Sequence, residues 1–216
     1  MLVRDAMTSR PITVHPESDC LAAIALMRAG RFSRIPVVDE NNRLVGVVSD
    51  DDVASLEVTR TTKSDAFRSD GVLVRVEEVM SAEVFTITPD YPLEEAASLM
   101  VRHRVGCLPV VDDSLHVGGI ITETDVFQTF VQVLGGGSHS HRVTVALPNT
   151  PGELAALTAQ IAQAGGNIDS IAALPTPDGH ALAFTLRVES IPLAALLEAI
   201  GRCPGAALIG AWEGSA

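Results

Sequence analysis

The order of hydrophobic and polar positions repeats itself in the N-terminal part of the chain. A shift of about 73 residues places residues 3–53 on residues 76–126 without a gap, and roughly 15 of about 51 positions are then identical. The shared positions include turn-forming and charged residues that chance does not align. Among them are the pairs Pro36 and Pro109, Gly46 and Gly119, and Asp52 and Asp125.

Each repeat predicts five elements. In the first repeat, residues 12–14 are a short β-rich run, and residues 21–30 carry apolar side chains at helical spacing. Residues 34–39 and 44–49 are predicted strands joined by turn residues, and a second helix is expected after Ser49. The order β-α-β-β-α spans about 50 residues, which is too few for a stable domain, so we expect two copies related by a pseudo-twofold axis to cover each other. The matching segments of the second repeat are 85–88, 93–103, 107–112, 117–122 and the helix after Thr122.

The last third of the chain has a different pattern. A glycine- and serine-rich stretch comes first, with His139 and His141 two residues apart. Two histidines without a third ligand are weak evidence for a metal, so we interpret the stretch as a linker. The pattern then predicts the order β-α-β-β-α-β of a ferredoxin-like fold, with Pro151 at the first helical position and a hairpin turn at Asp178-Gly179. The predicted fold class is therefore mixed α/β (α+β) throughout.

Composition and charge narrow the function classes. The chain has 216 residues and a formal net charge of −12, and an acidic surface repels nucleic acid, so we expect no nucleic-acid partner. No apolar run approaches the ~20 residues that a membrane helix needs, so we expect no membrane association and a cytoplasmic location. The three cysteines, Cys20, Cys107 and Cys203, are far apart and suit buried positions rather than disulfides or a metal site.

The repeated phrases GVVSDDDV and GIITETDV carry the candidate chemistry. Ser49 and Thr122 are expected at strand-to-helix junctions, where unpaired backbone N–H groups attract anions. The aspartate three residues later lies on the same face, where a carboxylate can accept two hydrogen bonds from a ribose. Each phrase can therefore hold a sugar and a phosphate. The alternative is that Asp52 and Asp125 only cap their own helices in a capping box.

The paired motifs MT…TV.P, PVVD and G-h-h-[S/T]-x-x-D, where h is a hydrophobic residue, resemble those of the CBS domain pair, or Bateman module, over residues 1 to about 130. The resemblance implies up to two clefts for adenosine nucleotides (AMP, ADP, ATP) or S-adenosylmethionine. Each cleft would combine the motif of one repeat with the N-terminal segment of the other. The first cleft would use Arg34, Ser49, Asp52, Met80, Ser81, Val84 and Phe85, and the second Met7, Thr8, Ile12, Thr122 and Asp125.

The two clefts are expected to differ at one position. Arg34 stands where basic residues meet phosphate in the CBS family, whereas the matching residue of the second repeat is Cys107, which cannot neutralise a phosphate. We therefore predict that the cleft containing Arg34 binds a charged nucleotide more tightly. The alternative for Arg34 is a surface ion pair with the acidic residues that follow Ser49.

Residues 142–212 resemble an ACT domain, on the segments PNTPGELAALT and AQAGGNI and the hairpin after them. ACT domains pair with each other and bind amino acids at the interface, so the resemblance implies an amino-acid site. Its candidate residues are Asn149, Gly165, Gly166, Asn167 and Ile168, with the two glycine N–H groups free to receive a carboxylate. The alternatives are a helix cap for Asn149 and a turn role for Asn167. Leu147, where some members have a polar residue, disfavours a serine-like ligand.

The whole arrangement resembles the acetoin-utilisation (AcuB-like) regulatory proteins of bacteria. We find no P-loop, GxSxG, HExxH or helix-turn-helix pattern, so we expect a sensor that is not an enzyme, requires no cofactor and signals to an unknown regulated protein. We also expect a homodimer, because such modules lack large interiors and bury apolar faces on each other. A structural adaptor and, behind it, a CBS-containing enzyme remain the alternatives. The expected segments are repeat 1 over 1–58, a connection over 59–75, repeat 2 over 76–134, the linker over 135–141 and the ACT-like domain over 142–214.

Overall fold

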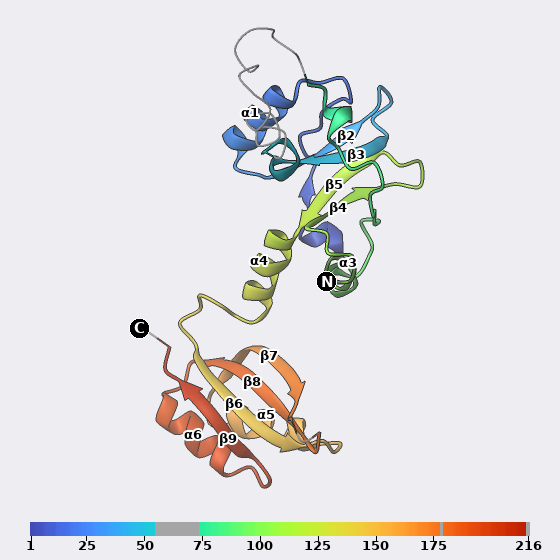
Figure 1. Cartoon of the computed structure of the whole chain (residues 1–216). Coiled ribbons are helices and arrows are strands. Elements are labelled where there is room, and N and C mark those ends of the chain that lie inside the picture. The colour runs from blue at the N-terminus through green and yellow to red at the C-terminus, as the bar shows by residue number, and fades with distance from the viewer. Residues whose placement is uncertain (55–73, 178, 215–216) are drawn as a thin grey trace. The chain divides into compact units, whose positions relative to one another are not determined.

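The computed structural model describes residues 1–54, 74–177 and 179–214. It forms two compact units, Met1–Phe127 and Gln128–Ala216, which are considered one at a time (Figure 1). Most of the expected connection over 59–75, and Asp178 of the expected hairpin turn, lie outside the described residues.

The first unit contains both repeats except the end of the last helix, and from the first helix onward each repeat is built in the predicted order. A helix is followed by an antiparallel pair of strands, and a second helix begins directly after the second strand. Both first helices end in the same way, because Arg31 and Arg104 adopt a left-handed conformation with φ 56° and close the last turn. The elements are α1 (Cys20–Gly30), β2 (Arg34–Val38), β3 (Leu44–Ser49) and helical residues 50–54 in repeat 1, and α3 (Leu93–His103), β4 (Cys107–Val111), β5 (Val117–Thr122) and α4 (Glu123–Val133) in repeat 2.

The prediction of a strand before the first helix of each repeat is wrong, because neither run forms a regular strand. The runs 12–14 and 85–88 each form one parallel bridge instead, from Val14 to Val37 and from Ile87 to Val110. The proline that closes each run ends the pairing, because it cannot donate a backbone hydrogen bond.

The two repeats exchange their N-terminal segments. The 3-10 helix η1 (Val3–Asp5) lies in repeat 2, where the Val3 N–H donates to the Tyr91 carbonyl at 2.9 Å and Val3 is fully buried among repeat 2 side chains. The 3-10 helix η3 (Val76–Glu78) makes the reciprocal contact, with the Val76 N–H donating to the Ser18 carbonyl at 2.9 Å and Val76 buried in the core of repeat 1. Because each core is completed by the other repeat, neither 50-residue unit is complete alone.

The exchange also places a short strand across the repeat boundary. Strand β1 (Thr8–Ser9) follows η1 and pairs with β5, so that Thr8 lies opposite Ile120. On the other side of the pseudo-twofold axis, Ser81 forms the matching antiparallel bridge with Val47 of β3. Residues near the start of each repeat therefore lie beside the last strand of the other.

The second unit has one antiparallel sheet in the order β7-β8-β6-β9, with a helix between β6 and β7 and another between β8 and β9 (Figure 1). This is the predicted ferredoxin-like order. Helix α5 begins at Glu153, so the prediction that Pro151 opens it at the first helical position is wrong; the N-cap is Gly152, with φ 97°. The elements are β6 (His141–Pro148), α5 (Glu153–Gln163), β7 (Asn167–Pro175), β8 (Ala181–Glu189), α6 (Leu193–Gly201) and β9 (Ala207–Trp212).

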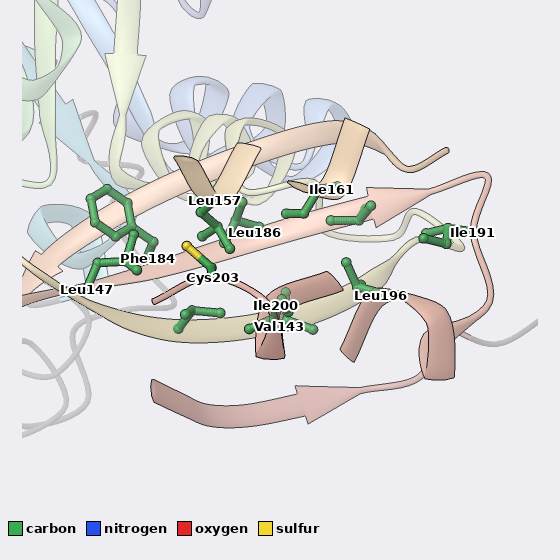
Figure 2. Close-up of a cluster of buried hydrophobic side chains, with 12 residues drawn as sticks. Val143, Leu147, Leu157, Ile161, Phe184, Leu186, Ile191, Leu196, Ile200 and Cys203 are labelled. Atoms are coloured by element: carbon green, nitrogen blue, oxygen red, sulfur yellow. The ribbon is translucent and has the colours of Figure 1, made fainter. Parts of the chain in front are cut away.

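The core of this unit lies on one face of the sheet. Alternate residues of β6 and β8 are buried, and they meet apolar side chains from both helices, as the labelled side chains in Figure 2 show. Leu147 is one of these fully buried residues, so its side chain packs in the core rather than facing a ligand. The two edge strands, β7 and β9, carry exposed apolar side chains, among them Leu174, Ile209 and Trp212.

Candidate site at the two strand-to-helix junctions

Both repeated phrases fold into the same hydrogen-bonded box. In repeat 1 the Asp52 Oδ2 atom accepts from the Ser49 N–H at 2.8 Å and from the Ser49 hydroxyl at 2.7 Å, and the Asp52 N–H donates to Ser49 Oγ at 3.2 Å. In repeat 2 the corresponding distances between Thr122 and Asp125 are 2.8, 2.7 and 3.3 Å. The capping-box alternative is therefore realised in both copies.

A capping role leaves room for a ligand role. Both accepted bonds end on the same carboxylate oxygen, so the second oxygen is not used by the box. All four side chains are half-buried, which leaves them in reach of solvent and of a bound molecule. The box also fixes the rotamer of each aspartate, so little side-chain entropy is lost when a ligand binds to it.

The structure brings the N-terminal segment of each repeat to the box of the other. A methyl group on Gly46 would lie 2.8 Å from the sulfur of Met80, and one on Gly119 would lie 2.5 Å from the sulfur of Met7. These two glycines precede the boxes by three residues, and because they lack a side chain they let the two methionine side chains approach the backbone closely. Ser81 and Thr8 follow the methionines and are exposed.

The other candidate residues near these segments lie in different surroundings. Val84 packs against the small apolar cluster of Val47, Cys107 and Ile120 that joins the repeats. Phe85 is 43% exposed, and its ring lies over that of His103, with 3.9 Å between the centroids. Ile12, the matching residue of the other repeat, is 47% exposed. Phe85 and Ile12 therefore offer apolar surface for a base, and only Phe85 stacks on a ring of the protein.

Arg34 extends away from its own repeat. Its backbone lies opposite Ser49 in the β2–β3 ladder, but its guanidinium lies over Gly106 of repeat 2. A methyl group on Gly106 would be only 2.7 Å from Cζ of Arg34. Sequence reasoning did not identify Gly106, because its importance comes from a side chain 72 positions away in the sequence.

Cys107 lies beside this arginine and is buried. Burial raises the pKa of the Cys107 thiol to about 11, while the charge of Arg34 lowers it and that of Glu123 raises it. The thiol is therefore protonated near neutral pH and behaves as a small apolar side chain.

Two further aspartates organise the loops between the paired strands. Asp39 Oδ1 accepts from the N–H groups of Asn41 and Arg43, and Asp112 Oδ1 accepts from those of Ser114 and His116. The backbone hydrogen bond from His116 is the main cause that lowers the pKa of Asp112. The final aspartate of each PVVD motif is therefore a loop-forming residue, a role that the sequence pattern alone did not reveal.

The candidate amino-acid residues of the second unit are largely engaged in the fold. The Gly165 and Gly166 N–H groups donate to the carbonyls of Ala162 and Ile161, both at 3.0 Å. The expectation that these two groups are free for a carboxylate is wrong, because they satisfy the carbonyls at the end of α5. Ile168 is half-buried and packs against the core.

The two asparagines have neither of the roles given as alternatives. The Asn167 amide donates to Glu189 Oε1 at 2.9 Å, and the residue begins β7 rather than a left-handed turn. Asn149 is exposed in the loop before α5 and does not cap that helix. Asn149 thus remains available to a ligand, whereas Asn167 would have to exchange its bond to Glu189.

Within residues 1–54, 74–177 and 179–214, none of the helices has both the length and the apolar character needed to cross a membrane. Within the same ranges, no group of three or more His, Cys, Asp or Glu side chains is placed to hold a metal ion.

Comparison with protein families agrees with the fold. The CBS domain model matches residues 3–58 and 76–131, and the ACT domain model matches residues 141–205. The CBS matches cover both strand-to-helix boxes, and the ACT match covers β6 to α6.

Three solved structures resemble the CBS part of the chain. A protein from Vibrio cholerae assigned to acetoin utilization (AcuB) has 30% identity and a TM-score of 0.55, over 62% of this chain and 95% of that one. The CBS domain pair of protein MJ0100, in complex with 5′-methylthioadenosine and S-adenosyl-L-methionine, has 28% identity and a TM-score of 0.54, over 61% and 97%. CBSX2 in complex with AMP has 30% identity and a TM-score of 0.52, over 61% and 97%.

Several curated enzymes also match, but over a small part of their length. The chain spans 23% of an L-aspartate semialdehyde sulfurtransferase and 21% of an inosine-5′-monophosphate dehydrogenase, both from Methanocaldococcus jannaschii. The similarity therefore says nothing about the remaining three quarters of those enzymes.

Proposed function

The chain belongs to the CBS-domain proteins and carries an ACT domain after its CBS pair, and from this we propose that it is a regulatory sensor of adenosine nucleotides or S-adenosylmethionine. The observation that carries the proposal is the pair of equivalent boxes, each beside the N-terminal segment of the other repeat. The bound AMP, S-adenosyl-L-methionine and 5′-methylthioadenosine of the two related CBS pairs support an adenosine ligand.

The chemistry of each cleft follows from its parts. The second carboxylate oxygen of Asp52 or Asp125, which the box does not use, is suited to accept from a ribose hydroxyl. The positive end of the helix dipole at each junction favours a phosphate or carboxylate. Met80 or Met7, with their flexible thioethers, and the exposed Phe85 or Ile12 provide apolar contact for the base. A ligand there touches both repeats, so its binding free energy depends on their relative placement, and this is how binding shifts a conformational equilibrium.

Isothermal titration calorimetry of the full chain with AMP, ATP and S-adenosylmethionine tests this function. We expect micromolar to millimolar binding of at least one ligand, and reduced binding in Asp52→Ala and Asp125→Ala, with Thr124→Ala as a matched control outside the box. Thr124 is exposed and makes none of the box hydrogen bonds. If no adenosine ligand binds at millimolar concentration, the structural-adaptor alternative replaces the sensor.

An amino-acid ligand of the ACT domain is a separate proposal. Asn149 is exposed near the start of α5, but both glycine N–H groups are occupied, so the site would need a different carboxylate partner. Titration of the full chain with branched and apolar amino acids, with Asn149→Ala as the variant, tests it. An unchanged heat signal with all of them would leave the ACT domain without this role.

A homodimer is proposed for the same protein, and β9 supports it. This edge strand exposes Leu208, Ile209 and Trp212, which are 48, 58 and 70% accessible. An exposed apolar strand at a sheet edge is an aggregation site unless another strand or surface covers it. A second copy of the chain is the proposed occupant, because a symmetric pair covers both copies of β9 at once.

The regulated partner is unknown. We propose that it reads a change in the relative placement of domains or subunits, as expected for a chain with two sensor modules. We propose no catalytic activity for the chain, since the enzymes that it resembles are matched over less than a quarter of their length.

A further inference from the structure

Helix α4 ends without a cation of its own. Its last turn contains no basic residue, whereas the last turn of α3 contains Arg102 and His103. The final carbonyls of a helix have no partner within the helix, and the negative end of the helix dipole lies there. A donor at the end of α4 must therefore come from elsewhere in the chain.

Arg187 supplies such a donor from the ACT sheet. It lies in the inner strand β8, 53 positions after Leu134, and its Nε–H donates to the Leu134 carbonyl at 3.1 Å. Both residues belong to the second unit, and the Arg187 side chain is half-buried. A charged donor strengthens a hydrogen bond, and a positive charge is favoured at the C-terminal end of a helix. Arg187 therefore joins the end of α4 to the sheet.

Two glycines let the chain leave the helix close to the sheet. Gly135 has φ 65°, and a methyl group there would lie 2.7 Å from Cδ of Arg187 and 3.0 Å from Oγ of Ser170 in β7. The Gly136 N–H donates back to the Val131 carbonyl at 2.6 Å, which closes the last turn of the helix. A side chain at position 135 would displace the arginine.

The chain stays hydrogen-bonded up to the first strand of the ACT domain. The Ser138 N–H and hydroxyl both donate to the Gly135 carbonyl, at 3.3 and 2.8 Å. The hydroxyls of Ser138 and Ser140 share a hydrogen bond of 2.6 Å, and Ser140 is buried directly before β6. The segment between α4 and β6 is therefore held by its own hydrogen bonds as well as by Arg187.

The other end of α4 carries the second box. Thr122 directly precedes the helix, and Asp125 lies in its first turn. The 11 residues of α4 form one uninterrupted helix, about 16 Å long at 1.5 Å per residue. A helix is stiff compared with a loop, so a displacement of its first turn reaches its last turn.

We propose that Arg187 fastens the end of α4 to the ACT sheet, and that α4 thereby carries the effect of a ligand at the Thr122–Asp125 box to the ACT domain. The inference rests on the proposed nucleotide-sensing function and adds the contact through which binding is passed on. The bond from Arg187 is either made or broken, so a ligand that orders the first turn of the helix favours the made bond. Arg187 is a positioning residue in this role and touches no ligand.

Hydrogen exchange of the full chain, measured by mass spectrometry, tests the contact first without ligand. Arg187→Ala is expected to speed the exchange of the residue 134–136 amides about fivefold, because the last turn of α4 loses its outside donor. Arg142→Ala is the matched control, since Arg142 is exposed and lies opposite Arg187 in the β6–β8 ladder. It removes a neighbouring positive charge and keeps the Arg187 bond, so exchange of the same amides should stay unchanged.

Two glycine variants test the geometry and keep the arginine. Gly135→Ala places a methyl group where the Arg187 side chain lies, so it is expected to speed exchange as Arg187→Ala does. Gly137→Ala is its matched control, because Gly137 also has a positive φ, 83°, but no atom of the described residues lies within 4 Å of the added methyl position. Circular dichroism melting of each variant confirms that the fold is retained.

AMP then tests the transmission. In the wild type and in Asp52→Ala, which leaves the second box intact, saturating AMP is expected to slow the exchange of residues 134–136 about fivefold. In Asp125→Ala this protection should be absent, because the second box is removed. In Arg187→Ala it should also be absent, although calorimetry still shows AMP binding, because the box is intact and only the far end of α4 is released.

The outcomes separate the contact from the function. If no adenosine ligand binds the wild type, the sensor function and its transmission through α4 both fail. If AMP binds but leaves residues 134–136 of the wild type unaffected, or protects them equally in Arg187→Ala, the sensor function stands and the role of Arg187 is overturned.

Discussion

Asp125→Ala separates the two roles that one carboxylate combines. The substitution removes the acceptor for the Thr122 N–H and hydroxyl, at 2.8 and 2.7 Å, and leaves only the bond from the residue 125 N–H to Thr122 Oγ1. The junction is half-buried, so water replaces part of the lost bonding. Loss of an N-terminal cap typically costs about 1 kcal/mol, with a range of about 0.5–2 kcal/mol, and we expect about 1–1.5 kcal/mol for the ligand-free protein.

Urea unfolding measures this cost. The midpoint should fall while the slope with urea concentration stays unchanged, because the surface exposed on unfolding is the same. Asp52→Ala should cost the same amount, since its box has nearly the same distances. Thr124→Ala, outside the box, is the control and should shift the midpoint far less.

Ligand then distinguishes binding from capping. Saturating the wild type at about 100 times its dissociation constant should add about 2.7 kcal/mol of stability. Without ligand, Asp125→Ala should be less stable than the wild type by the cost of the lost cap. With ligand, its free energy of unfolding should also rise by less than that of the wild type. Ligand-free stability equal to that of the wild type would show that the carboxylate contributes nothing as a cap, and the reasoning from the box would be refuted.

Three further predictions follow from burial and exposure. Val3→Ala should destabilise the CBS part by about 2 kcal/mol in urea unfolding, because it removes two buried carbons from the core of the opposite repeat; an effect below about 0.5 kcal/mol would contradict the exchange of segments. The Cys107 thiol, with a pKa of about 11, should be only about one part in a thousand thiolate at pH 8, so its alkylation rate, followed by peptide mass spectrometry, should rise about tenfold per pH unit from pH 7.5 to 9.5; a plateau near pH 9 would show an ordinary thiol. Ile209→Glu should halve the mass measured by light scattering, while Leu174→Glu on the other edge strand should not, and dilution of the wild type should shift the fluorescence of Trp212, the single tryptophan, to longer wavelength; a mass of one chain in the wild type would remove the dimer.

The duplicated pattern was enough to predict both repeats because helices and their starts depend on interactions between residues close together in the sequence. Apolar spacing marked α1 and α3, and the hydroxyl-to-aspartate motif marked the helix starts after Ser49 and Thr122. The error over residues 12–14 and 85–88 arose because β-rich residues favour an extended backbone but cannot report whether a neighbouring strand is available to pair with them.

The amino-acid site shows a different limit of sequence reasoning. Gly165 and Gly166 were correctly expected to end α5, but whether their N–H groups stay free depends on where the carbonyls of the last turn point. When the two glycines end the helix, their N–H groups donate to its last carbonyls and can no longer donate to a carboxylate. Asn149 is exposed in the structure, and its role as a ligand contact remains a prediction.

The sequence by itself determined the two repeats, their pseudo-symmetry, the order of elements in both units and the residues of each box, because these follow from periodicity and from contacts within a few residues. Only the tertiary structure decided that Val3 and Val76 complete each other's cores and that the Arg34 guanidinium lies on Gly106. A long side chain can extend several ångströms in any direction, and its direction is chosen by what the opposite repeat leaves open. Here Gly106 leaves that space for Arg34, whereas Cys107, the residue equivalent to Arg34, has a side chain too short to cross to the opposite repeat, so the surroundings of the two boxes differ.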